Sequence, residues 1–157
     1  MGGIVSDGGT ASEGGRAGRP YVIGDKTCWT KSELAAGLTS NFAQGVQDLE
    51  DGKISQWLER QLNDSENASF ATRQAGSDSD VWLLRLALRL DPGLSPTWWG
   101  HSLAPTDLHA LVSRAVGGDG KSKELLEEIL RKRVLLEFSR LSESVRSFVC
   151  EAYHVDL

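Results

Sequence analysis

The chain has 157 residues, of which 39% are hydrophobic and 25% charged, and its formal net charge is −5. These values are typical of a globular protein that is long enough to bury a core, and they exclude a wholly disordered chain. The negative charge and the scattered basic residues argue against nucleic-acid binding, which requires a basic face.

Cysteine content and hydropathy bear on the compartment. Only Cys28 and Cys150 are present, far apart in the sequence, whereas small secreted scaffolds usually carry several disulfides. The N-terminus has no apolar signal region, and no apolar run approaches the 18 residues of a membrane span. We therefore expect a cytoplasmic protein that does not insert into membranes.

The N-terminal composition predicts a boundary near residue 20. Residues 1–19 include seven glycines and almost nothing to bury, which predicts a flexible tail or linker, and residues 20–157 are expected to form a single helical domain. Residues 20–29, "PYVIGDKTCW", could form one edge strand or an extended N-terminal arm.

The first half of the domain shows helical periodicity. Thr30 and Glu33 have capping-box spacing, so a helix is expected to begin there. An apolar stripe then runs to Gly52, as one helix or as two helices broken near Thr39 and Ser40. Further helices are expected over 53–64, over 68–74 and over 78–91, the last being the most apolar and therefore central.

The second half is also helical. Pro92 and Pro96 break helicity in a loop, after which residues 104–118, 122–141 and 142–157 favour helices, with Ser122 and Ser142 as N-caps. The predicted fold class is therefore all-α, a compact multi-helix bundle of about seven helices.

The stretch "AVGGDGKSKELLEEIL" superficially resembles a phosphate-binding loop. In that motif a glycine stands five residues before the final Gly-Lys-Ser/Thr, but this chain has Ala115 there, and the preceding segment has helical periodicity. We expect a connector in which Gly117 or Gly118 ends one helix and the next begins at Ser122, with no nucleotide cofactor.

Metal and nucleophile motifs are not apparent. His101, His109 and His154 have no Cys or carboxylate partners at ligand spacing, so no metal site is expected. A nucleophilic site built from Cys28 or Cys150 with His154 is formally conceivable, but Cys150 in "SFVCEAY" is more typical of a helix core. We therefore expect a protein without enzymatic activity.

The tryptophans suggest a recognition site. Five tryptophans are present, and Trp57 and Trp82 lie in apolar stripes where core packing is the rule. Trp98 and Trp99 instead lie in the Pro-flanked loop "LSPTWWGHSL", where two adjacent aromatic rings cannot easily both face inward. One should fill the core and the other should be exposed, so we predict partner contacts at Trp98, Trp99 and His101, although local packing of both rings is the alternative.

Several of these segments together resemble a helical module of large bacterial multidomain proteins. The shared pattern is a helix ending at Leu-x-x-Gly, a Trp-Leu pair, a Leu-Asp-Pro turn and a Trp-Gly step. Here these are Leu49 and Gly52, Trp57-Leu58, Leu90-Asp91-Pro92 and Trp99-Gly100. The resemblance covers about residues 25 to 140, and it implies a non-catalytic accessory region beside chaperone-like or kinase-like ATPase domains.

The function predicted from the sequence is an interaction module that acts as an adaptor or regulatory domain through a protein partner. Two alternatives remain open. One is a small regulatory subunit or inhibitor of a transcription or defence factor, partly unfolded when free. The other is an enzyme with a cysteine or histidine site.

Overall fold

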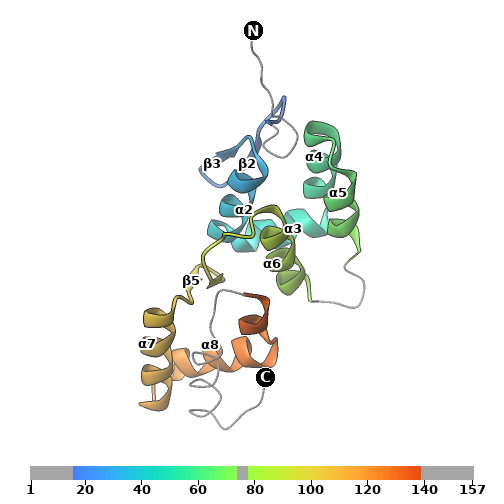
Figure 1. Ribbon diagram of the computed structural model, residues 1–157. Coiled ribbons are helices and arrows are strands. Elements are labelled where there is room, and N and C mark those ends of the chain that lie inside the picture. The colour runs from blue at the N-terminus through green and yellow to red at the C-terminus, as the bar shows by residue number, and fades with distance from the viewer. Residues whose placement is uncertain (1–15, 74–77, 139–157) are drawn as a thin grey trace. The chain divides into compact units, whose positions relative to one another are not determined.

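The computed structural model describes residues 16–73 and 78–138 (Figure 1). The chain divides into two compact units, one up to Leu94 and one from Ser95 onward, and each is described by itself. The boundary falls inside the loop that contains Pro92 and Pro96. Apart from these two prolines, the pattern of residues 20–157 contains no signal for it.

The predicted all-α class is confirmed. The described residues contain seven α-helices, one short 3₁₀-helix and two short hairpins. The helices are α2 (Lys31–Ser40), α3 (Phe42–Glu50), α4 (Lys53–Leu62), α5 (Ser65–Thr72), α6 (Ser79–Leu90), α7 (Pro105–Val116), α8 (Gly120–Arg131) and the 3₁₀-helix η1 (Val134–Glu137).

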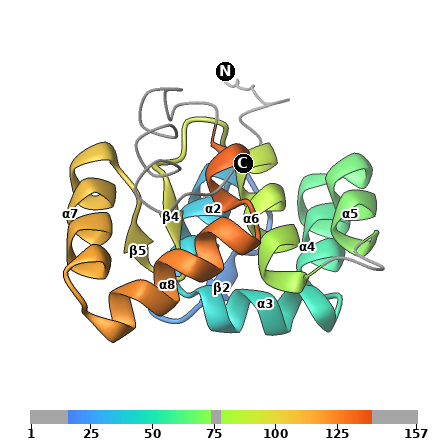
Figure 2. The same cartoon turned by 90° about the horizontal axis from the view of Figure 1, so that it is seen from below.

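Helix α6 is central to the first unit, as its apolar sequence predicts. It packs against α2, α3 and α5, while α4 and α5 lie side by side (Figures 1 and 2). Leu83, Leu84 and Leu86 of α6 are completely buried. They face α2, whose Leu34 and Leu38 are also completely buried. One continuous apolar core therefore joins these helices.

Side-chain N-caps mark the start of two helices in this unit, α2 and α5. The capping box is confirmed, because Thr30 Oγ1 accepts from the Glu33 backbone N–H at 3.2 Å and Glu33 Oε1 accepts from the Trp29 N–H at 2.6 Å. The apolar stripe forms two helices, which meet at Asn41. The helix expected over 68–74 instead begins at Ser65, because Asp64 caps it by accepting from the Asn67 N–H.

The predicted extended N-terminal segment is a two-stranded hairpin, β2 (Tyr21–Ile23) and β3 (Lys26–Cys28). Residues 16–19, which the sequence places in the tail, also pack against this unit. The Ala17 N–H donates to Trp29 O at 2.8 Å, and the Arg19 carbonyl accepts from Trp57 Nε1 at 2.8 Å. The remainder of the predicted tail lies outside the described residues.

A buried hydrogen bond ties this hairpin to the helices. Tyr21 Oη donates to Asp48 Oδ2 at 2.6 Å, and Gln44 Nε2 donates to Asp48 Oδ1 at 2.8 Å. The Asp48 side chain is almost fully buried, with Lys53 Nζ 4.0 Å away. Burial, together with the hydrogen bond and negative charge of Asp48, raises the pKa of Tyr21 well above its ordinary value.

The second unit contains α7, α8 and η1. α7 ends at Val116, and Gly118 follows with φ +103°, so the connector expected between two helices is confirmed. The N-cap of α8 is Asp119 and not Ser122, because the Asp119 carboxylate accepts from the Ser122 backbone N–H at 3.1 Å.

The helix predicted over 122–141 ends early. α8 stops at Arg131, Arg133 takes a left-handed φ of +56°, and the chain turns into η1, where Val134 and Leu135 are completely buried. The chain reverses here, and the reversal places both apolar side chains in the core. The free energy gained by burying them outweighs the helix propensity of the segment. The helix predicted over 142–157, with its Ser142 cap, lies outside the described residues.

No helix in residues 16–73 or 78–138 combines the length and apolar character needed to cross a bilayer.

Replacement of Tyr21 by Phe should lower the free energy of unfolding by about 1–3 kcal/mol, because Asp48 would stay buried with one hydrogen bond fewer. Urea denaturation at pH 7, followed by circular dichroism, measures this. The Val22→Ala variant is the matched control, since Val22 is the neighbouring strand residue and is exposed. Equal losses in the two variants would contradict the role assigned to this hydrogen bond.

Stability should also fall in alkali through Tyr21. Its pKa is raised in the folded state, so the unfolded chain releases the phenolic proton first, near its ordinary pKa of about 10. The contribution of protonated Tyr21 to the free energy of unfolding is complete below that pH, and it is lost as the pH rises further. Between about pH 9 and pH 11 the wild type should therefore lose more stability than Tyr21→Phe. Parallel pH profiles of the two proteins would refute this.

Candidate functional site

The Pro-flanked loop forms a second hairpin, β4 (Thr97–Trp98) and β5 (His101–Ser102). Trp98 pairs with His101, so the turn consists of Trp99 and Gly100 alone, with φ of +50° and +82°. Two successive positive φ angles are the signature of the type I′ turn, whose twist suits a two-residue hairpin. Gly adopts this conformation easily, but tryptophan does not.

Trp98 anchors the hairpin. Its side chain is completely buried, its Nε1 donates to Glu128 Oε1 of α8 at 2.8 Å, and Lys132 Nζ lies 5.8 Å from the ring centroid. Buried indole N–H groups need an acceptor, and Glu128 supplies it. The ring therefore attaches the short hairpin to α8.

Trp99 is presented at the tip. It is 38% exposed and packs edge-on against Trp98, with the ring centroids 6.5 Å apart and an interplanar angle of 88°. A bulky residue in the left-handed region is a backbone outlier that costs of order 1–3 kcal/mol. Asn or Gly would adopt this backbone conformation with less strain. Trp99 therefore occupies a strained position, and burial of its side chain is only partial.

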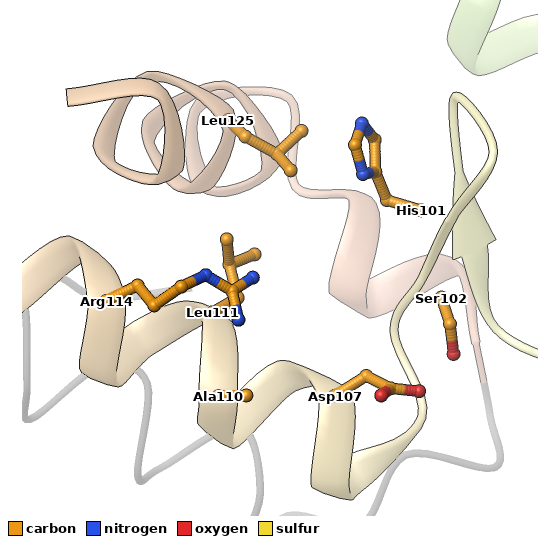
Figure 3. A pocket seen from close by; sticks show the side chains of 7 residues that line it. All are labelled: His101, Ser102, Asp107, Ala110, Leu111, Arg114 and Leu125. Carbon is orange, nitrogen blue, oxygen red and sulfur yellow. The ribbon is translucent and has the colours of Figure 1, made fainter. Parts of the chain in front are cut away.

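A pocket of about 190 Å³ lies beside this hairpin, within the second unit (Figure 3). The side chains of Leu111 from α7 and Leu125 from α8 point toward one another across it, and the His101 ring lies on the hairpin side. Its lining consists of His101, Ser102, Asp107, Ala110, Leu111, Arg114 and Leu125.

Four of these lining residues come from one face of α7. Asp107, Ala110, Leu111 and Arg114 stand at positions i, i+3, i+4 and i+7, which the helical period brings to the same side. The two ends of this face carry opposite charges. Figure 3 shows the Asp107 carboxylate directed toward the hairpin and the Arg114 guanidinium beside Leu111.

The Arg114 side chain is held in place from α8. Its Nε donates to Ser122 Oγ at 3.2 Å, and Ser122 Oγ in turn donates to the Asp119 carboxylate. The hydroxyl and backbone N–H of Ser122 hold the pKa of Asp119 below its ordinary value, and the Arg114 cation acts in the same direction. This bond uses Nε and does not involve the two Nη atoms of Arg114.

The three residues predicted to contact a partner are thus separated by the structure. Trp98 is buried, so its side chain positions the hairpin and is not itself available to a partner, whereas Trp99 and His101 are exposed. The residues predicted to contact a partner did not include Asp107 or Arg114. The i, i+3, i+4, i+7 spacing could have grouped them on one face, but it could not reveal that the hairpin and α8 close a pocket over that face.

The cysteine that the structure describes is unsuited to nucleophilic catalysis. Cys28 is 1% exposed, its Sγ donates to the Glu33 carbonyl at 3.3 Å, and burial followed by the Glu33 charge raises the pKa of its thiol. Reactive cysteines show the opposite shift. Cys150 and His154 lie outside the described residues, and no cluster of potential metal ligands occurs within residues 16–73 and 78–138.

Comparison with known proteins adds no relative: the chain matches no protein-family model, no curated protein and no solved structure.

The two neighbouring tryptophans should respond differently to substitution. Trp98→Ala should lower the free energy of unfolding by about 3–5 kcal/mol, the usual cost of truncating a buried aromatic side chain. Trp99→Asn should stay within about 1 kcal/mol of the wild type, because relief of strain in the type I′ turn offsets the lost ring contact. Urea denaturation compares the three proteins, and a larger loss for Trp99→Asn than for Trp98→Ala would show the opposite division of roles.

Proposed function

We propose that this chain is a non-enzymatic protein-interaction module, which acts as an adaptor or regulatory domain and binds a protein partner through the tip of the β4–β5 hairpin. The observation that carries the proposal is the strained, half-exposed Trp99. Strained backbone at an exposed residue is concentrated at functional sites, and tryptophan is among the residues most enriched in interface hot spots.

The neighbourhood of Trp99 supports this assignment. His101 lines a pocket whose wall contains apolar side chains as well as the charged Asp107 and Arg114, and protein interfaces combine the same two kinds of side chain. The buried Trp98 holds the tip rigidly on α8, so less conformational entropy is lost when a partner binds.

The residues of the bacterial accessory-module pattern have structural roles that fit such a module. Leu49 and Trp57-Leu58 are buried, Gly52 has φ +79° at the start of α4, and Trp99-Gly100 forms the strained turn. The resemblance stated from the sequence is the basis on which we propose that the module belongs to bacterial multidomain proteins. The reduced, buried Cys28 suits the cytoplasm.

Affinity capture from a lysate of the source cells tests the function, using the wild type, Trp99→Asn and Val116→Ala as baits. Val116 is an exposed apolar residue of α7 in the same unit, which makes it a matched control. A protein retained by the wild type and Val116→Ala should be lost with Trp99→Asn, by tenfold or more if Trp99 supplies about 1.4 kcal/mol or more. Circular dichroism verifies that each bait is folded.

Equal capture by all three baits would reject the hairpin as the recognition element. If no bait retained any protein, the interaction function would lose its support, and the enzyme alternative would need direct assay.

A further inference from the structure

A second cleft, of about 280 Å³, lies in the first unit, where β2 meets α4. Its lining consists of Tyr21, Lys53, Gln56, Trp57, Arg60 and Gln61. All of these except Tyr21 come from α4, at positions i, i+3, i+4, i+7 and i+8, which the helical period brings to one face. Both charged residues of this face are cations, and among the residues that the structure describes no acidic side chain lines the cleft.

The positive charge of the cleft is only partly balanced by the described part of the chain. Arg60 is exposed, and its side chain has no hydrogen-bond or ion-pair partner among the described residues. The Lys53 side chain is 63% exposed, and its Nζ lies 4.0 Å from Asp48 Oδ1, the outer limit of an ion pair. The Asp48 carboxylate is buried, and Tyr21 and Gln44 already bond to its two oxygens. An excess of positive charge therefore remains, in a chain whose net charge is −5.

The polar groups of the cleft are mainly hydrogen-bond donors. Gln61 Oε1 accepts from the Arg19 backbone N–H at 2.9 Å, which orients this amide, and Gln61 Nε2 forms no hydrogen bond within the described residues. Lysine and arginine side chains carry donors and no acceptor. A ligand that satisfies such a lining supplies acceptors and negative charge, as a carboxylate or a phosphate does.

Two aromatic rings form the apolar part of the lining. The Tyr21 and Trp57 rings pack edge to face, with their centroids 5.7 Å apart and an interplanar angle of 78°. Tyr21 Oη is bonded to Asp48 and Trp57 Nε1 to the Arg19 carbonyl, so both rings are held in place before a ligand arrives. Pockets for organic ligands begin at about 300 Å³, close to the volume of this cleft, and a bare inorganic anion would leave the rings uncovered. The ligand therefore includes an apolar body beside its anionic group.

We propose that this cleft binds a small organic anion, a carboxylate or a phosphate attached to an apolar body. The anionic group pairs with Lys53 and Arg60 and accepts a hydrogen bond from Gln61 Nε2. The apolar body lies against the rings of Trp57 and Tyr21. This site goes beyond the proposed function, because it lies in the first unit and uses no residue of the β4–β5 hairpin.

Phenyl phosphate, which joins a phosphate to an apolar ring, is the first probe. It is titrated into the full chain at constant ionic strength, and proton–nitrogen NMR follows the indole N–H groups. The chain has five tryptophans, and Trp57→Phe identifies the resonance of Trp57. Phenyl phosphate should shift this resonance saturably in the millimolar range, as expected for so small a ligand, and should leave the Trp98 resonance of the second unit unchanged.

Further probes separate charge from ring contact. Benzoate carries a carboxylate and should shift the Trp57 resonance as phenyl phosphate does. Benzylamine and benzyl alcohol keep the ring without the negative charge, so neither should shift it. Inorganic phosphate lacks the ring and should bind more weakly than phenyl phosphate, because it buries no apolar surface.

Two charge-neutralising variants assign the anionic group. Lys53→Gln and Arg60→Gln should each weaken the binding of phenyl phosphate by about two- to fivefold, the range expected for an exposed charge pair. Lys26→Gln is the matched control, since Lys26 is an exposed cation of β3 in the same unit and does not line the cleft. It should leave the affinity unchanged, and circular dichroism verifies that all variants are folded.

The proposal is overturned if phenyl phosphate leaves the Trp57 resonance unchanged, or if benzylamine or benzyl alcohol shifts it at the same concentrations. Wild-type affinity in both Lys53→Gln and Arg60→Gln would overturn it as well. Equal affinities for inorganic phosphate and phenyl phosphate would contradict the contact assigned to the two rings.

Discussion

Burial of the Trp98 side chain is the constraint on which the rest of the candidate site depends. β4 and β5 contain two residues each, and so short a hairpin has too few backbone hydrogen bonds to be stable alone. The indole ring compensates, since it is fully enclosed and bonded through Nε1 to Glu128. With one ring of the Trp98-Trp99 pair held inside, the tight turn leaves the other at the surface.

The same anchoring explains how a small unit can hold an organised pocket. α8 supplies Glu128 to the hairpin and Ser122 to Arg114 of α7, so it positions both the hairpin and the Arg114 side chain. The Asp119 carboxylate caps α8 and also accepts the hydroxyl of Ser122, which couples the start of the helix to the orientation of the guanidinium. Rigid support of this kind reduces the entropy that binding would otherwise cost.

In the first unit a buried polar contact has a comparable structural role. Asp48 is enclosed between the β2–β3 hairpin and the helices, where Tyr21 and Gln44 satisfy its two oxygens. A buried carboxylate is costly without partners, and these bonds impose one position on the hairpin. The long apolar faces of α2 and α6 contribute most of the buried area, but they do not by themselves determine where a three-residue strand docks.

The sequence by itself determined the fold class, most helices, the capping box at Thr30 and Glu33, and the helical nature of the segments around Gly117 and Gly118. Those features follow from spacing and capping chemistry within a few residues. It also indicated that one of Trp98 and Trp99 would be exposed. Tertiary structure decided which one, because the choice depends on Glu128, thirty residues away, as the acceptor for the buried indole. Tertiary structure also ended α8 at Arg131, because burial of Val134 and Leu135 outweighs helix propensity there. It brought His101, Asp107 and Arg114 to the same pocket. The sequence could not show this, because contact between distant segments leaves no local pattern in the chain.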